Sequence, residues 1–172
     1  PELTRNAIEK KLDLLLTQYG ENTQLLTAKA LLLQQRGKQE EALTMIRQVL
    51  SLDNKDLYAV VVEARLLQQL KRDDEAFARL EQVVQIFPTN RRLRLQYARL
   101  LMSKDMNAAK EQFEILLGMA PGDPDLLLSL GLISKETNQL DDAQLYFERL
   151  LESGNRTTES HYYLGQLAEI KQ

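Results

Sequence analysis

The stretch SLGLISKETNQLDDAQLYFERLLESGN, residues 129–155, decides the fold of this chain. Its apolar residues recur at three- and four-residue spacing in two blocks, which is the pattern of amphipathic helices. The polar run ETNQ at 136–139 separates the two blocks and predicts a turn. The stretch therefore predicts two helices joined by a short connection.

The same pattern recurs along the chain every 34 residues, and once after 33. Small residues mark the first helix of each pair: Ala30, Ala64, Ala98, Gly131 and Gly165. A second series, Ala42, Ala76, Ala109 and Ala143, is followed four positions later by the large apolar residues Ile46, Leu80, Phe113 and Phe147. A small residue lets two helices approach closely, and the bulky side chain fills the adjoining space. A unit of this size cannot bury its apolar faces alone, so the units must stack.

With this pattern the chain resembles the tetratricopeptide repeat family, which places Leu-Gly on the first helix, Ala and then Phe on the second, and Pro at the unit end. The matching residues are Leu130–Gly131, Ala143 and Phe147, with Pro88 and Pro121 at the ends of their units. The resemblance implies an all-α, right-handed superhelical solenoid of stacked antiparallel helix pairs, with about nine helices.

Three residues depart from the family pattern. Lys29 and Glu63 occupy the position of the usual Leu beside the small residue, and Arg94 occupies that of the usual Trp. We expect looser packing at these positions. The third unit is also one residue short near MSKDMN, residues 102–107, where the usual turn Gly is missing. We expect a tighter turn there.

The repeat register predicts a single array over residues 1–172. We assign residues 1–22 to the second helix of a preceding repeat, four repeats to 23–56, 57–90, 91–123 and 124–157, and residues 158–172 to the first helix of a truncated fifth repeat. On this assignment the chain begins and ends within a unit, as a piece of a longer array would.

Composition excludes several classes of function. Lys and Arg number 22 against 25 Asp and Glu, a net charge of -3 with a pI near 5.3, so no basic field favours nucleic acid as a partner. An RNA-reading helical-repeat protein is therefore a weak alternative. The absence of cysteine excludes disulfides and thiolate chemistry but suits any compartment. Apolar runs of only a few residues predict no membrane insertion, and both the cytoplasm and the bacterial periplasm or envelope stay open.

The sequence carries little that could support catalysis. His161 is the single histidine, and no phosphate loop, nucleophile elbow or dinucleotide fingerprint is present. Asp141 and Asp142 are adjacent, but neighbouring side chains on a helix point about 100° apart, so they do not converge on one metal or proton. Their register places them in the first turn of a second helix, where free N–H groups and the helix dipole favour acids. We expect no enzyme activity, no metal and no cofactor.

In the resembled family, first helices line a concave groove that binds partner proteins. The corresponding positions in this chain give the candidate groove residues Tyr58, Val61, Arg65, Arg92, Leu95, Gln96, Arg99, Leu128, Leu132 and Tyr162. Arg65 and Arg99 share a register one unit apart, and guanidinium groups pair with carboxylates. We therefore expect an acidic or amphipathic protein segment as the partner. The alternative is that the arginines pair with local acids such as Glu63 and that Leu132 belongs to the core.

The resemblance thus implies a non-enzymatic interaction scaffold or adaptor that binds a partner segment in the groove. A second hypothesis is a structural assembly factor that associates through the ends of the array. Such a factor would form part of a larger repeat protein, for example a bacterial envelope lipoprotein or a complex subunit, and could self-associate through the exposed ends. The sequence leaves the identity of the partner open, because this fold serves many functions.

Overall fold

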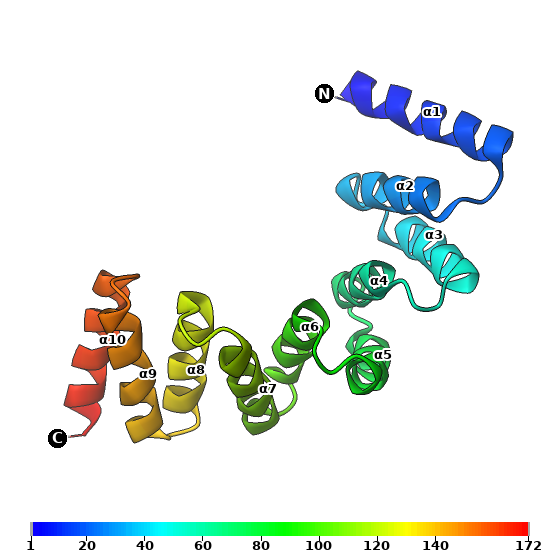
Figure 1. The fold of residues 1–172 in the computed structure, drawn as a ribbon. Helices are drawn as coiled ribbons and strands as arrows, with labels where there is room; N and C mark the ends of the chain where they lie inside the picture. The colour runs from blue at the N-terminus through cyan, green and yellow to red at the C-terminus, as the bar shows by residue number, and fades with distance from the viewer. Residues whose placement is uncertain (1, 172) are drawn as a thin grey trace. The chain divides into compact units, whose positions relative to one another are not determined.

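The computed structural model describes residues 2–171, which form ten α-helices and no β-strand (Figure 1). The helices are α1 (Glu2–Tyr19), α2 (Thr23–Gln35), α3 (Gln39–Leu52), α4 (Leu57–Gln69), α5 (Asp73–Ile86), α6 (Arg91–Leu101), α7 (Met106–Met119), α8 (Pro124–Glu136), α9 (Leu140–Glu152) and α10 (Thr157–Ile170). The predicted all-α class is confirmed, with ten helices over the described range where about nine were expected. None of these ten is both long and apolar enough to cross a membrane.

The chain divides into two compact units. Pro1–Phe87 contains α1 to α5, and Pro88–Gln172 contains α6 to α10. Within each unit, every helix packs against the next helix along the chain. Each unit therefore builds its core from contacts between sequence neighbours, which is the packing expected of a repeat array.

The first helices α2, α4, α6 and α8 begin at side-chain caps. The capping residues are Asn22, Asp56, Asn90 and Asp123, and each accepts a hydrogen bond from one or two backbone N–H groups of the first turn. Such a cap typically contributes about 1 kcal/mol. Pro124 follows Asp123 at the first helical position, where its missing N–H costs nothing.

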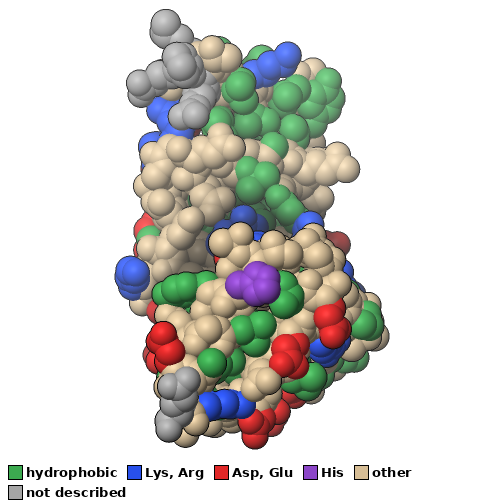
Figure 2. Space-filling view, turned by 90° about the vertical axis from the view of Figure 1, so that its left-hand side faces the viewer, with side chains coloured by type: hydrophobic (Ala, Val, Ile, Leu, Met, Phe, Trp, Pro, Cys, Tyr) green, Lys and Arg blue, Asp and Glu red, His purple; other side chains and the backbone are tan. Residues whose placement is uncertain are grey.

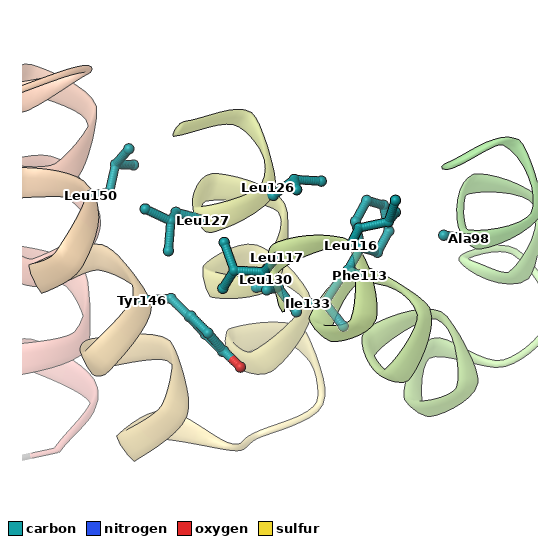
Figure 3. Packing of buried hydrophobic residues seen from close by; sticks show 10 residues of the cluster. All are labelled: Ala98, Phe113, Leu116, Leu117, Leu126, Leu127, Leu130, Ile133, Tyr146 and Leu150. Carbon is teal, nitrogen blue, oxygen red and sulfur yellow. The ribbon is translucent and has the colours of Figure 1, made fainter. Parts of the chain in front are cut away.

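The small residue of the first helix permits close helix packing, most clearly at Gly131. A Cβ placed on Gly131 would lie 2.5 Å from a ring carbon of Phe147, which is fully buried. Figure 3 shows the neighbouring cluster, in which Phe113, Leu127 and Leu130 pack between α7, α8 and α9. The predicted pairing of a small residue with a bulky one therefore brings α8 against α9.

The expectation of looser packing at Glu63 and Arg94 is wrong. Glu63 is 7% exposed and pairs with Arg47 at 3.2 Å and Arg79 at 3.4 Å. Arg94 is 8% exposed and donates to the carbonyl of Pro88 at 2.7 and 3.2 Å. Buried charges are tolerated when they are paired in this way.

Lys29 and Glu63 form the same contact with the charges reversed. Lys29 of α2 pairs with Asp13 of α1 at 2.5 Å, and Glu63 of α4 pairs with Arg47 of α3 at 3.2 Å. Both members of the second pair lie 34 residues after their counterparts in the first. Because α1 contacts α2 in the register in which α3 contacts α4, α1 is packed as a second helix.

The missing residue of the third unit does not tighten its turn, contrary to expectation. Helix α6 has 11 residues where α2, α4 and α8 have 13, and the turn to α7 spans residues 102–105. The other three turns contain three residues, one of which has a positive φ: Gly37, Lys71 or Asn138. In the longer turn, Asp105 caps α7 by accepting from Asn107 and Ala108. The deficit therefore shortens the helix and replaces the left-handed turn residue with a cap.

The second helices α7 and α9 are connected by polar contacts. Lys110 of α7 is 8% exposed and donates to Asp142 and Gln139. The Tyr146 hydroxyl of α9 donates to Glu114 of α7 at 2.9 Å. Burial, followed by this hydrogen bond, raises the pKa of Tyr146. These contacts hold successive repeats together on the side formed by second helices.

Candidate functional site

A cleft of about 330 Å³ lies between α6 and α8 in the second unit. It is lined by Arg91, Arg92, Leu95 and Arg99 of α6, by Phe113 and Leu116 of α7, and by Asp123, Asp125, Leu126 and Ser129 at the start of α8. The apolar lining from α7 and α8 is buried, whereas the three arginines are exposed. The cleft thus has an apolar floor and a cationic rim.

Helix geometry explains the grouping on α6. Arg92, Leu95 and Arg99 are spaced by three and four residues, which places them on one face of the helix. Leu95 is half-buried and packs against the core of the second unit. The two guanidinium groups therefore stand at the ends of a short apolar strip.

The acidic side chains of the cleft are already paired. Asp123 accepts from Arg91 at 3.0 Å, while its other oxygen caps α8. Asp125 pairs with Arg156 at 2.5 Å. This hydrogen bond, together with the nearby charge of Glu159, raises the pKa of Arg156. Arg99 pairs with no carboxylate within residues 2–171, so the rim retains a positive charge that can meet an acidic partner.

The cleft brings together Arg92, Leu95 and Arg99 from the ten sequence candidates. Four others also lie in the second unit: Gln96, Leu128 and Leu132 are half-buried, and Tyr162 on α10 is 60% exposed. Leu128 and Leu132 pack against a core cluster with Phe147, as the alternative reading of Leu132 anticipated. Tyr162 accepts a hydrogen bond from Gln166 at 2.7 Å.

The remaining three candidates belong to the first unit. Tyr58 is 40% exposed and Arg65 is exposed. Val61 is only 2% exposed, because it faces the core of its unit, and so it has no surface to offer a partner. The hypothesis that Arg pairs with Glu63 holds for Arg47 and Arg79, neither of which was a groove candidate.

The first unit has a cleft in the same register, between α2 and α4. It measures about 380 Å³ and is lined by Thr23, Gln24, Thr27, Ala28, Leu31, Asp56 and Tyr58. Tyr58 and Gln24 occupy the position that Arg92 holds in the charged cleft. No Lys or Arg lines this cleft of the described chain, so the two clefts suit different ligands.

Sequence reasoning missed the ion pairs that shape the charged cleft. Arg91 pairs with Asp123 32 residues later, and Asp125 pairs with Arg156 31 residues later. Both separations are close to one repeat, so opposite charges about 34 residues apart were the available signal. They were not found because the search followed each helix rather than the period.

Asp141 and Asp142 do not form a metal or proton-transfer site. The carboxylate of Asp141 pairs with Lys171 at 2.7 Å, which lowers the pKa of Asp141, and Asp142 pairs with Lys110. Across the part of the chain that the structure describes, acidic and histidine side chains nowhere gather in a group that could hold a metal ion. The sequence predicted the place of the two acids in the first turn of a helix but missed their ion pairs across helices.

Comparisons with known proteins agree with this architecture. Residues 23–56 and 63–90 each match a family described as tetratricopeptide repeat. No curated protein sequence matches the chain.

Solved structures of low sequence identity share the fold. MamA from Desulfovibrio magneticus RS-1 is 20% identical, with a TM-score of 0.77 over 88% of this chain and 86% of that one. The pilF protein of Pseudomonas aeruginosa is 20% identical, with a TM-score of 0.78 over 98% and 78%. YrrB, described as a TPR protein with an unusual peptide-binding site, is 14% identical, with a TM-score of 0.73 over 92% and 82%.

Proposed function

The chain is a tetratricopeptide-repeat protein, and we propose that it is a non-enzymatic scaffold that binds a segment of a partner protein in the α6–α8 cleft. Stacked helix pairs of this kind generally serve as protein-interaction scaffolds, because they present extended surfaces without needing a catalytic centre. The partner segment is acidic and amphipathic.

The observation that carries this proposal is the joint placement of Arg92, Leu95 and Arg99 in one cleft. A carboxylate on the partner would pair with Arg99, and a neighbouring apolar side chain would cover Leu95 and the floor at Leu126. Arg and apolar anchors surrounded by a polar rim are the usual composition of binding hot spots. The peptide-binding site named for YrrB is in keeping with such a role for this fold.

Selection of phage-displayed random peptides on the wild-type chain supplies a probe for the cleft. We expect the selected peptides to carry Asp or Glu beside an apolar residue, and their affinity to fall with added salt, since exposed charge pairs are screened. In titration calorimetry, Arg99→Glu should weaken the binding of such a peptide by about tenfold or more, because it places like charges together.

Lys104→Glu is the matched control for this experiment. Lys104 is exposed in the turn after α6 and lies outside the cleft lining, so the same charge reversal there should leave the affinity unchanged. Equal loss in both variants would mean that only the overall charge matters. Unchanged binding by Arg99→Glu and by Arg92→Glu would remove the cleft as the binding site.

The assembly hypothesis from the sequence depends on other residues. It requires free faces on the helices at the two ends of the described array, α1 and α10, rather than the cleft between α6 and α8. The two functions are therefore separable by mutation, and the exposed face of α10 is the observation that favours the second.

A further inference from the structure

Helix α10 leaves one face open. Its other side is anchored by Leu167, which is 1% exposed, and by Tyr163, which stacks on Phe147 with ring centroids 4.9 Å apart. On the open face, His161, Gly165 and Ala168 are exposed. Figure 2 looks onto this end of the second unit, where the histidine lies among hydrophobic side chains.

The same positions are covered in every preceding first helix. On α8 the equivalents of His161, Leu164, Gly165 and Ala168 are buried: Leu127, Leu130, Gly131 and Ser134. On α2, α4 and α6 the equivalent residues are also buried, except for the half-buried Lys29. In each of those repeats the covering element is the second helix. The face of α10 is therefore shaped to receive a second helix.

Gly165 shows what is missing. A Cβ on Gly131 would meet the ring of Phe147 at 2.5 Å, whereas a Cβ on Gly165 would meet nothing within 4 Å. In the four complete pairs, a large apolar side chain of the second helix occupies this space. Gly165 is thus an empty socket of the same form.

Helix α1 carries the complementary face. It packs on α2 as a second helix does, since Asp13–Lys29 repeats the contact of Arg47–Glu63. Its residues in register with the buried Ala42, Ile46 and Val49 are Ile8, Leu12 and Leu15. Ile8 is 48% exposed, and the two leucines are half-buried rather than buried. The face of α1 that would contact its own first helix is uncovered.

We propose that the open faces of α10 and α1 bind each other between two copies of the chain, head to tail. Helix α1 of one molecule takes the place of a second helix on α10 of the other, with Leu12 over Gly165 and Ile8 at the position held by alanine elsewhere. The contact continues the interface that α8 and α9 already form within the chain. Because the two faces differ, the association is heterologous, and each molecule retains one free face.

Two single substitutions test this contact. Gly165→Leu fills the socket, yet it should not disturb the free chain because its surroundings are open. Ile8→Lys places a charge on the exposed face of α1. Gly118→Leu is the matched control, since Gly118 is likewise exposed, helical and without neighbours within 4 Å, but lies on α7.

Sedimentation equilibrium over a concentration series measures the outcome. Wild type and Gly118→Leu should show an average mass that rises with concentration. Gly165→Leu and Ile8→Lys should each remain at the mass of one chain. An equimolar mixture of these two variants retains one intact pair of faces and should form a dimer of twice the chain mass, and nothing larger.

Three results would overturn the proposal. A wild-type chain that stays monomeric would show that the two faces do not bind each other, and another helix would then cover them. Association of Gly165→Leu as strong as wild type would place the contact elsewhere. Dimers formed by Ile8→Lys alone would indicate that α10 pairs with α10. Peptide binding in the α6–α8 cleft is unaffected by any of these results.

Discussion

Gly131 and Phe147 approach so closely that any side chain on residue 131 would overlap the ring. The Phe147 ring is fully buried and stacks on Tyr163, so it has little room to move. The pair therefore sets the distance between α8 and α9, and its effect can be compared directly with that of Gly165 in the same register.

Gly131→Ala should destabilise the chain by about 1–3 kcal/mol, the usual cost of overpacking a core. Gly165→Ala should instead stabilise it by roughly 1 kcal/mol, because alanine favours the helix and meets no neighbour there. Urea unfolding followed by circular dichroism measures both midpoints. Equal effects of the two substitutions would contradict the difference in their surroundings.

The reversed ion pairs predict a pair of compensating substitutions. Glu63→Lys leaves a buried cation beside Arg47 and Arg79 and should cost about 3 kcal/mol or more. Adding Arg47→Asp recreates the Asp13–Lys29 arrangement and should restore part of that loss. A double-mutant cycle in urea gives the coupling energy, and a coupling near zero would show that Arg47 and Glu63 act independently.

Lys71→Gly should stabilise the turn between α4 and α5. Lys71 has φ 61°, a left-handed conformation that costs a residue with a side chain about 1 kcal/mol or more. Glycine relieves this strain but gains freedom in the unfolded chain, so the net stabilisation is roughly 0.5 kcal/mol. Gly37→Lys, in the same turn position at φ 75°, should lower the unfolding midpoint. Opposite signs in thermal unfolding confirm the role of the backbone, and a loss in both would refute it.

Arg94→Ala should destabilise the second unit by about 2 kcal/mol, because the carbonyl of Pro88 loses its donors in a part-buried site. Arg94→Lys retains the charge but lacks the fork that reaches both Pro88 and Gln112, so it should recover only part of the stability. Urea unfolding of the two variants tests this order. A lysine variant as stable as wild type would mean that charge alone suffices.

The architecture could be predicted from the sequence because its signals recur. The small residue followed 15 or 16 positions later by a large one marks each helix pair, and Gly131 with Phe147 confirms the physical reason. The deficit in the third repeat was located correctly, but its effect was not. Periodicity counts residues and does not say whether a helix or its turn gives up the missing one.

The site was harder to predict for a related reason. Register placed Arg92, Leu95 and Arg99 on the face that lines the cleft, but the same register also selected Val61, which is buried. A position in a repeat gives a direction, whereas exposure depends on the size of the neighbouring side chains. The pairs of Arg91 with Asp123 and Asp125 with Arg156 depend on contacts between repeats, which no single helix reveals.

The opposite charges of Lys29 and Glu63 also bear on how a repetitive chain avoids misfolding. Similar helices can exchange places during folding, and misassembly of this kind is a characteristic hazard of repeat proteins. If α1 slipped by one repeat onto α4, Asp13 would face Glu63. If α3 slipped back onto α2, Arg47 would face Lys29. Both errors bring like charges together, so the alternation of sign marks each helix for its own neighbour.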